Sequence, residues 1–396
     1  MAGFVHKPVS WHRAAAADWA AGAREAALDR CLQALDSDPA PSPDAFIQPG
    51  FYAFQLERFD IATAVLERGL AKFSIHPMIL LSLGSSYSRW RKHERAIPLL
   101  ERFLALGIVD ASAYDALAMS CSAIGDMVRA RRFGTMALDA KDALTKGRHG
   151  SPSLNPPGDA ASRRKMISFS LFGSHPRYLR GALHNVLAAR TLYPGWTCRF
   201  TVDDSVDATL LEVMTEEGAE IVQDDSGDHD LRHRLSRRFL VSDDPDVGSF
   251  LVRDCDSVVS AREAAAVAEW LGSGLPFHAM RDYYTHTDPL LAGMWSGIAG
   301  VFPDMKNAIA RYREATPLNL NWDQFFLRDR VWPAIRNDVM VHDRYFTAHR
   351  ARPFPTATPA GEQHVGQDEY AANPIDQAAA LLRYAGRVPA LGIPIE

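Results

Sequence analysis

Cysteine is scarce in this sequence, and long apolar runs are missing. The four cysteines, at positions 31, 121, 198 and 255, are far apart and form no Cys-x-x-Cys pair. Their spacing argues against a disulfide framework and against a zinc site. No window comes near the ~20 apolar residues that a transmembrane helix requires, and residues 1–11 lack the charged-then-apolar pattern of a secretion signal. We therefore expect a cytoplasmic protein without a transmembrane segment.

A strong charge of either sign is also absent. The formal net charge is −5, which argues against a nucleic-acid partner bound through a basic surface. A chain of 396 residues with 47% hydrophobic residues is long enough for two or three globular domains. We therefore expect a multidomain globular protein.

A repeat is present in the first third of the chain. Small residues recur every 34 positions, as in Gly50, Gly84 and Ala118. Small residues at equivalent helix positions allow two helices to approach closely. Through Gly84, Tyr87 and Ala96 the segment resembles tetratricopeptide repeats, whose unit is a helix-turn-helix. A plain helical bundle with coincidental spacing is the alternative. For residues 1–145 we expect an all-α, tetratricopeptide-like repeat domain that binds a protein partner or a second copy of the chain.

Residues 146–164 are polar and rich in Pro and Gly, which is typical of a domain linker. After the linker, short apolar stretches alternate with amphipathic ones, and this alternation indicates a parallel, doubly wound sheet. We assign residues 165–375 to this α/β domain and residues 376–396 to a C-terminal helix and tail.

One strand of this domain ends in two acids. Residues 249–252 are apolar or small, and they run directly into Arg253-Asp254-Cys255-Asp256. A buried strand that stops there delivers two carboxylates to the edge of the sheet where ligands bind in α/β proteins. Two such acids attract a hard divalent cation, which in turn can hold a diphosphate. A solvated loop with two acids is the alternative. We expect Cys255, between the acids, to point into the core.

The second half of the chain resembles nucleotide-diphospho-sugar transferases of the GT-A type, which have a Rossmann-like mixed sheet. The whole chain resembles bacterial proteins in which tetratricopeptide repeats are fused to such a domain. The matching segments are residues 168–173, 193–196, 253–257, 278–282, 293–297, 323–327, 342–343 and 365–366.

The resemblance implies a metal site and a donor site. Mn²⁺ or Mg²⁺ would be held by Asp254, Asp256 and His342, with Asp256 as a direct ligand. His364 is the rival of His342, and a purely structural histidine is the alternative for both. Donor binding is assigned to nine residues: Ser170, Phe172, Gly173, Asp203, Arg253, Asp254, Arg281, Gly293 and Trp295.

Some of these positions have ordinary structural alternatives. Gly293 would let the backbone approach a ligand and Trp295 would stack on a sugar, but both also suit a tight core strand. Arg253 could instead pair with a nearby acid.

Two further acids are catalytic candidates. Asp323 could orient the acceptor or take its proton as a general base, which an inverting mechanism needs and a retaining one does not. Capping a helix is its structural alternative. Asp282 could hold the hydroxyls of the donor sugar.

The favoured hypothesis is a metal-dependent glycosyltransferase that uses a nucleotide sugar, most simply a UDP-sugar, on a protein or surface-glycan acceptor. The repeats would recruit the acceptor or a partner, or support a homo-oligomer. The alternative is an inactive GT-A-like scaffold that acts through its repeats.

Overall fold

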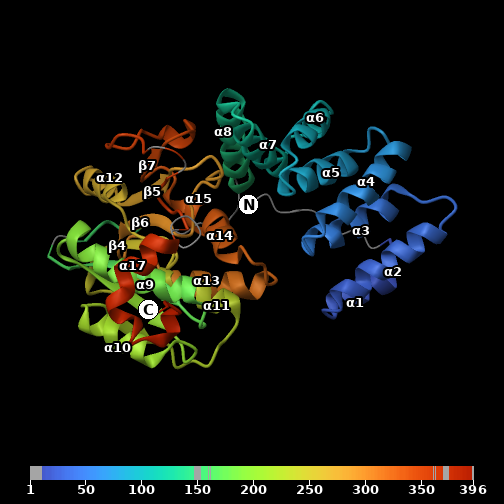
Figure 1. Cartoon of the computed structure of the whole chain (residues 1–396). Helices are drawn as coiled ribbons and strands as arrows, with labels where there is room; N and C mark the ends of the chain where they lie inside the picture. Colours follow the sequence, from blue (N-terminus) through green and yellow to red (C-terminus); the bar gives the residue numbers. More distant parts are fainter. Residues whose placement is uncertain are drawn as a thin grey trace. The chain divides into compact units, whose positions relative to one another are not determined.

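The computed structural model describes residues 11–146, 153–158, 160, 162–359, 361, 363–368 and 374–394, with side chains omitted at 374–378. The chain divides into two compact units, Met1–Lys141 and Asp142–Glu396 (Figure 1). The larger apolar clusters each lie within one unit, so each unit has a core of its own.

The helical part consists of consecutive helix pairs. Its helices are α1 (Arg13–Ala20), α2 (Arg24–Ser37), α3 (Pro43–Gln55), α4 (Phe59–Lys72), α5 (Pro77–Arg89), α6 (His93–Leu104), α7 (Ala111–Ala123) and α8 (Met127–Thr145). Positive φ angles recur every 34 residues, at Glu57 (58°), Arg91 (59°) and Gly125 (82°). Each of these residues follows the first helix of a pair, where a left-handed residue reverses the chain. The recurrence confirms the prediction of helical repeats.

Small residues bring the paired helices together. A Cβ atom at Gly50 would lie 2.8 Å from Cγ of Leu66, and one at Gly84 would lie 2.6 Å from Cγ of Leu100. Both distances are shorter than Cβ contacts normally are, so glycine lets these two helix pairs pack more closely than a larger residue would without a shift of the leucine. The third unit has Ala118 at the equivalent position.

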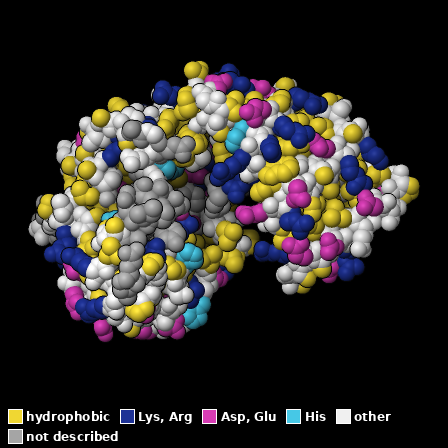
Figure 2. Space-filling view, in the orientation of Figure 1, with side chains coloured by type: hydrophobic (Ala, Val, Ile, Leu, Met, Phe, Trp, Pro, Cys, Tyr) yellow, Lys and Arg dark blue, Asp and Glu magenta, His cyan; other side chains and the backbone are white. Residues whose placement is uncertain are grey.

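Equivalent ion pairs join successive repeat units. Arg95 of α6 reaches Glu67 of α4 at 2.5 Å, and Arg129 of α8 pairs in the same way with Glu101 of α6. Figure 2 shows acidic and basic side chains interspersed over the whole helical unit. Exposed pairs of this kind contribute only ~0–1 kcal/mol each, but their recurrence shows that consecutive units pack in one register.

The second unit is built on a seven-stranded sheet of order β3-β2-β1-β4-β6-β5-β7. The strands are β1 (Arg164–Leu171), β2 (Trp196–Val202), β3 (Glu220–Gln223), β4 (Val247–Arg253), β5 (Phe277–Arg281), β6 (Met294–Ile298) and β7 (Val339–Asp343). Neighbouring strands are parallel except where β6 lies between β4 and β5, antiparallel to both. The sheet is therefore mixed, as the predicted fold class has it, and β6 is the strand that departs from the parallel arrangement indicated by the alternation of apolar and amphipathic stretches.

Helices cover both faces of this sheet. One face packs under α9 (Pro176–Leu192), α10 (Ala208–Glu216) and α12 (Ala261–Leu271). The other face packs under η1 (Arg237–Asp243), α13 (Met305–Ala315), α14 (Trp322–Phe326), η2 (Leu327–Val331) and α15 (Trp332–Ile335). Since β4 is buried along its whole length, it has the near-continuous apolar run that a doubly covered strand needs.

The C-terminal helix α17 (Pro374–Ala385) belongs to the α/β core, because Leu381 and Tyr384 lie in the same apolar cluster as α9. The predicted boundary between residues 375 and 376 falls inside this helix.

Candidate functional site

The strand order reverses between β1 and β4. From β1 the chain moves outward to β2 and β3 and then returns, so that β4 lies on the other side of β1. In α/β sheets such a reversal opens a crevice at the carboxyl ends of the strands, and ligands bind there. Ser170, near the end of β1, and Asp254, directly after β4, lie on this edge.

The turn that carries the two acids is held by α9. A Cβ atom at Gly181 would lie 2.0 Å from the carbonyl oxygen of Cys255, so the helix packs directly on the backbone of the turn. Asn185 donates from Nδ2 to the carbonyls of Cys255 (3.3 Å) and Ser257 (3.0 Å) and accepts from the Val259 amide (3.0 Å). Cys255 points into the core, as expected, with Sγ 3.3 Å from the carbonyl of Ser170. The turn is therefore rigidly placed.

Arg238 of η1 joins two of the predicted acids. Its Nη2 donates to Oδ2 of Asp323 at 2.7 Å, and its Nη1 donates to Asp254. A Cβ atom at Gly293 would lie 1.9 Å from Oδ2 of Asp254. The loop before β6 therefore closely approaches this carboxylate, and the approach of Gly293 to a bound ligand stays a prediction. The backbone amide of Arg238 donates to the Ser170 hydroxyl at 2.9 Å, so residues from five segments meet here.

Arg177 of α9 joins the second acid of the pair to a later segment. It forms ion pairs with Asp256 and, at 2.9 Å, with Asp368. The carboxylate of Asp254 is 46% exposed, and that of Asp256 is 14% exposed. One acid of the pair therefore faces solvent, and the other lies beneath it.

The acid cluster around Arg177 and Arg238 has more acidic than basic side chains. Burial raises the pKa of Asp256, and the neighbouring charge of Asp254 raises it further against the opposing effect of Arg177. Burial likewise raises the pKa of Asp323, despite its ion pair with Arg238. Raised carboxyl pKa values mean that the ionised forms are disfavoured, so a bound cation would stabilise them.

A second group lies at the ends of β1 and β2. The Arg234 guanidinium lies 5.3 Å from the ring centroid of Phe172 and pairs with Asp203 at 2.8 Å. The Gly173 amide donates to the Ser205 hydroxyl at 2.6 Å. The structure thus brings the predicted residues Phe172, Gly173 and Asp203 together. Of the three, Asp203 lines an acidic cavity of about 240 Å³, in which Asp203, Asp204 and His229 have metal-ligand spacing.

Three predicted donor-binding side chains point elsewhere. Arg253 is buried and pairs with Glu263 of α12 at 3.3 Å. Arg281 is buried and pairs with Asp343 of β7 at 2.6 Å. Trp295 is fully buried among aromatic rings of the core. Each points into a packed face of the sheet, so the structure does not support these three predictions.

His342 is also placed away from the acid pair. Its strand, β7, is separated from β4 by β6 and β5. Its Nδ1 lies 2.8 Å from Nε2 of His278, and its Nε2 lies 3.3 Å from Oε2 of Glu269 in α12. Both ring nitrogens are engaged by protein groups, so His342 does not complete a metal site at Asp254 and Asp256.

Asp282 and His364 lie near one another beside the site. Arg262 binds Asp282 through two hydrogen bonds of 2.8 and 2.9 Å, and the Val365 amide donates to the same carboxylate at 2.9 Å. Asp282 therefore anchors the segment 363–368, and its side chain is fully buried, so it does not face a sugar at the surface of the site. His364, in that segment, stacks on Tyr283 at 4.0 Å.

Sequence reasoning missed the side chains that hold the acids in place, namely Arg177, Asn185, Arg238 and Gln324. Gln324 accepts from the Ala292 amide at 3.0 Å and donates to Leu290, which fixes the loop that leads to Gly293. In the sequence, Arg238 stands directly before the apolar residues 239–241 of η1, and a charged residue next to such a run was the available signal. The structure shows that Arg238 is buried. Asp323 does not cap α14; Asn321 holds that position.

The chain matches no protein-family model and no curated protein. Among solved structures it is similar to MamA (MSR-1), at 21% identity and a TM-score of 0.30, over 35% of this chain and 83% of that one. A tetratricopeptide-repeat protein of Thermus thermophilus is 16% identical, with a TM-score of 0.28, over 34% of this chain and 77% of that one. An O-GlcNAc transferase variant of Thermobaculum terrenum is 18% identical, with a TM-score of 0.35, over 60% of this chain and 44% of that one. These distant likenesses carry no weight for the site. The repeats and the mixed sheet are established by the contacts described above.

Proposed function

We propose that the α/β unit is a metal-dependent glycosyltransferase domain of the GT-A type. It would transfer a sugar from a nucleotide sugar, most simply a UDP-sugar, to a protein or surface-glycan acceptor. The observation that carries this proposal is the acid pair Asp254 and Asp256, which follows the central strand β4 at the edge where the strand order reverses. Such an edge is where α/β proteins bind nucleotides.

The charge of the cluster suits one divalent cation. Four carboxylates, of Asp254, Asp256, Asp323 and Asp368, face two guanidiniums, of Arg177 and Arg238. Two negative charges are left over. Carboxylate oxygens are the ligands that Mg²⁺ and Mn²⁺ prefer. Asp254 and Asp256 would hold the ion, and the ion would offset charge on the leaving diphosphate.

The remaining residues of the site would position the donor. Asp203 lines the cavity of about 240 Å³ after β2 and β3, where it would contact the nucleobase or ribose, and Phe172 and Gly173 lie next to Asp203 through Arg234 and Ser205. Arg238 would keep the carboxylates of Asp254 and Asp323 in fixed relative positions. Asp323 would then orient a hydroxyl of the bound sugars or accept its proton.

The repeats would supply the acceptor or a partner, since stacked helical repeats commonly present extended binding surfaces.

No helix among the described residues is long and apolar enough to cross a membrane.

Thermal unfolding with UDP-, GDP- and CDP-sugars, with and without Mn²⁺, tests the proposal. We expect one donor to raise the midpoint only when the metal is present, and Asp256→Ala to abolish the rise. Slow hydrolysis of the same donor without acceptor would separate an enzyme from an inactive scaffold. Absence of any metal-dependent stabilisation would refute the proposal.

A further inference from the structure

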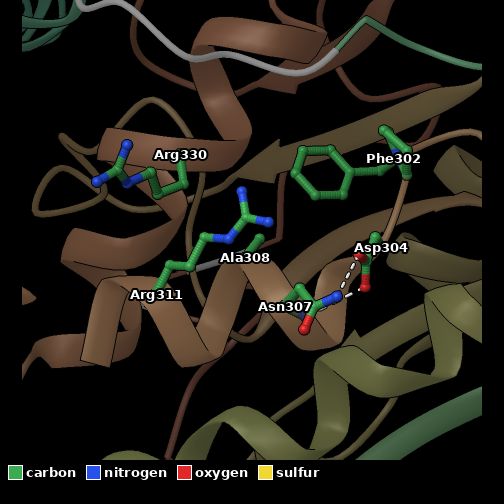
Figure 3. A pocket seen from close by; sticks show the side chains of 7 residues that line it. Phe302, Asp304, Asn307, Ala308, Arg311 and Arg330 are labelled. Atoms are coloured by element: carbon green, nitrogen blue, oxygen red, sulfur yellow. Dashed lines mark hydrogen bonds between the residues drawn. The ribbon is translucent and has the colours of Figure 1, made fainter. Parts of the chain in front are cut away.

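A separate pocket of about 300 Å³ lies in the α/β unit, lined by residues of the loop after β6, of α13 and of η2 (Figure 3). Its position follows from the register of β6. Met294 pairs with Arg253, and Ile298 pairs with Ser249, so β6 runs from the carboxyl end of β4 toward its amino end. Phe302 comes after β6, so the pocket lies at the edge of the sheet opposite to Asp254.

Two arginines of this pocket have no acidic partner in direct contact. Arg311 and Arg330 make no hydrogen bond and no ion pair to any described group. Every other arginine in the described part of the α/β unit has at least one such contact. Closely spaced arginines on the same elements show the contrast: Arg313 pairs with Asp228, and Arg328 pairs with Asp329.

Arg330 does have a ring contact, since its guanidinium lies 5.5 Å from the ring centroid of Tyr312. A stacked guanidinium keeps its in-plane N–H donors available. In Figure 3 the Arg311 guanidinium lies at the centre of the lining residues.

The one acid of the pocket is already occupied. Asp304 is the N-cap of α13, and its carboxylate accepts from the backbone amide (3.2 Å) and the side-chain amide (2.5 Å) of Asn307. The amides of Met305 and Lys306 donate to Asp243. The start of α13 therefore offers no free amide, and the donors that remain are the two guanidiniums.

We propose that this pocket binds a small phosphate-bearing ligand, separate from the candidate active site. Guanidinium groups bind phosphate oxygens through paired, charge-assisted hydrogen bonds. Against the single acid of the pocket, Asp304, which lies in the field of Arg311, the two guanidiniums leave a net positive charge, and the several oxygens of a phosphate can accept from both of them. Phe302, Pro303 and Ala308 form an apolar wall beside them, which suits an organic group attached to the phosphate. The source is free phosphate or a phosphate monoester.

Calorimetric titration of the full chain tests the proposal, with inorganic phosphate, glycerol 3-phosphate and acetate at constant ionic strength. We expect both phosphates to bind more tightly than acetate, and each of Arg311→Gln and Arg330→Gln to weaken that binding by about tenfold. Tighter binding of glycerol 3-phosphate than of inorganic phosphate would identify a monoester as the ligand, and equal binding would identify free phosphate.

Lys306→Gln is the matched control, because it removes one positive charge from the same helix outside the pocket. We expect it to leave phosphate binding unchanged. Arg311 is exposed, so Arg311→Gln should fold even if Arg330→Gln does not. Phosphate binding that Arg311→Gln leaves intact, or that Lys306→Gln weakens equally, would overturn the proposal, as would equal binding of acetate.

Discussion

Arg238 is the residue on which the geometry of the acid cluster depends. It is buried, and its guanidinium touches carboxylates from two different elements. Removing one partner of a buried ion pair typically costs about 3–5 kcal/mol, because the remaining charge is left uncompensated. Replacing it by lysine keeps the charge but loses the planar fork that reaches two carboxylates at once.

We therefore expect Arg238→Lys to fold and to reduce metal-dependent hydrolysis of the donor by about tenfold to a hundredfold, since small displacements of reacting groups have effects of this size. Arg199→Lys is the matched control. Arg199 also bridges two acids, Glu220 and Asp244, each at 2.6 Å, away from the site. Comparable hydrolysis by the two variants would exclude a positioning role for Arg238.

His286 has a partly buried ring that must stay neutral in the folded chain. Its Nδ1 accepts hydrogen bonds from the amides of Asp282 (3.0 Å) and Tyr283 (3.2 Å). Burial lowers the pKa of His286 to about 3. Because the unfolded side chain takes up a proton near pH 6.5, its contribution to stability is complete above that pH and declines as the pH falls toward 3.

We expect His286→Asn, which keeps an acceptor at the Nδ1 position, to flatten the acid side of the stability curve. The free energy of unfolding should lose about 1.4 kcal/mol less per pH unit below pH 6.5 than in the unmodified chain. Chemical denaturation between pH 5 and pH 7 measures this slope. His175→Asn is the control, since His175 also accepts a backbone amide through Nδ1 (3.2 Å) but is exposed. An equal change of slope in both variants would contradict the argument.

At the residue level, the sequence predicted the acid pair but not which neighbours face it. Side chains alternate along a strand, and Leu251 and Arg253 point to the face covered by α9 and α12, whereas Val252 points to the other. The same alternation of side chains along a strand decides which face of the sheet Trp295 and His342 point to. The period of two predicts that such residues share a face, but only long-range packing decides whether a helix covers it.

Helices and strands were easier to predict than the neighbours with which they pair and the direction of that pairing. The 34-residue spacing predicted the repeats because each unit repeats one local contact, such as Gly84 with Leu100. The core-strand alternative for Gly293 and Trp295 corresponds to β6, but burial carries no information on strand direction. The antiparallel placement of β6 depends on pairing with β4 and β5, which no local pattern encodes.

The Gly84–Leu100 contact gives a prediction at the level of elements. Gly84→Ala would place Cβ 2.6 Å from Leu100 Cγ, so we expect a loss of about 1–3 kcal/mol in the free energy of unfolding. Leu100→Ala alone should cost about 2–5 kcal/mol through a cavity. The double variant should lose clearly less than the two losses combined, because the new methyl group fills part of that cavity. Simple additivity in chemical denaturation would mean that the helices do not meet at this point.

At the scale of the whole molecule, the candidate sites described above belong to one of the two units. The described acid cluster, the cavity at β1 and β2, and the arginine pocket all consist of residues of the unit Asp142–Glu396. None of them draws a residue from the repeats. Under the proposed function, the chemistry of the donor therefore depends on the second unit, and the choice of acceptor depends on the first.

Deleting the residues before Asp142, where the second unit begins, tests this division. The shortened chain retains the described core of the sheet, so we expect it to unfold cooperatively and to hydrolyse the donor at an unchanged rate. Transfer to the natural acceptor should fall by about a hundredfold, because the acceptor is no longer held at high effective concentration. The separate repeat unit, added in excess to the full chain, should compete for the acceptor and inhibit transfer while leaving hydrolysis untouched. If transfer and hydrolysis fell together in a shortened chain that is still folded, the repeats would be supporting the active site rather than recruiting its acceptor.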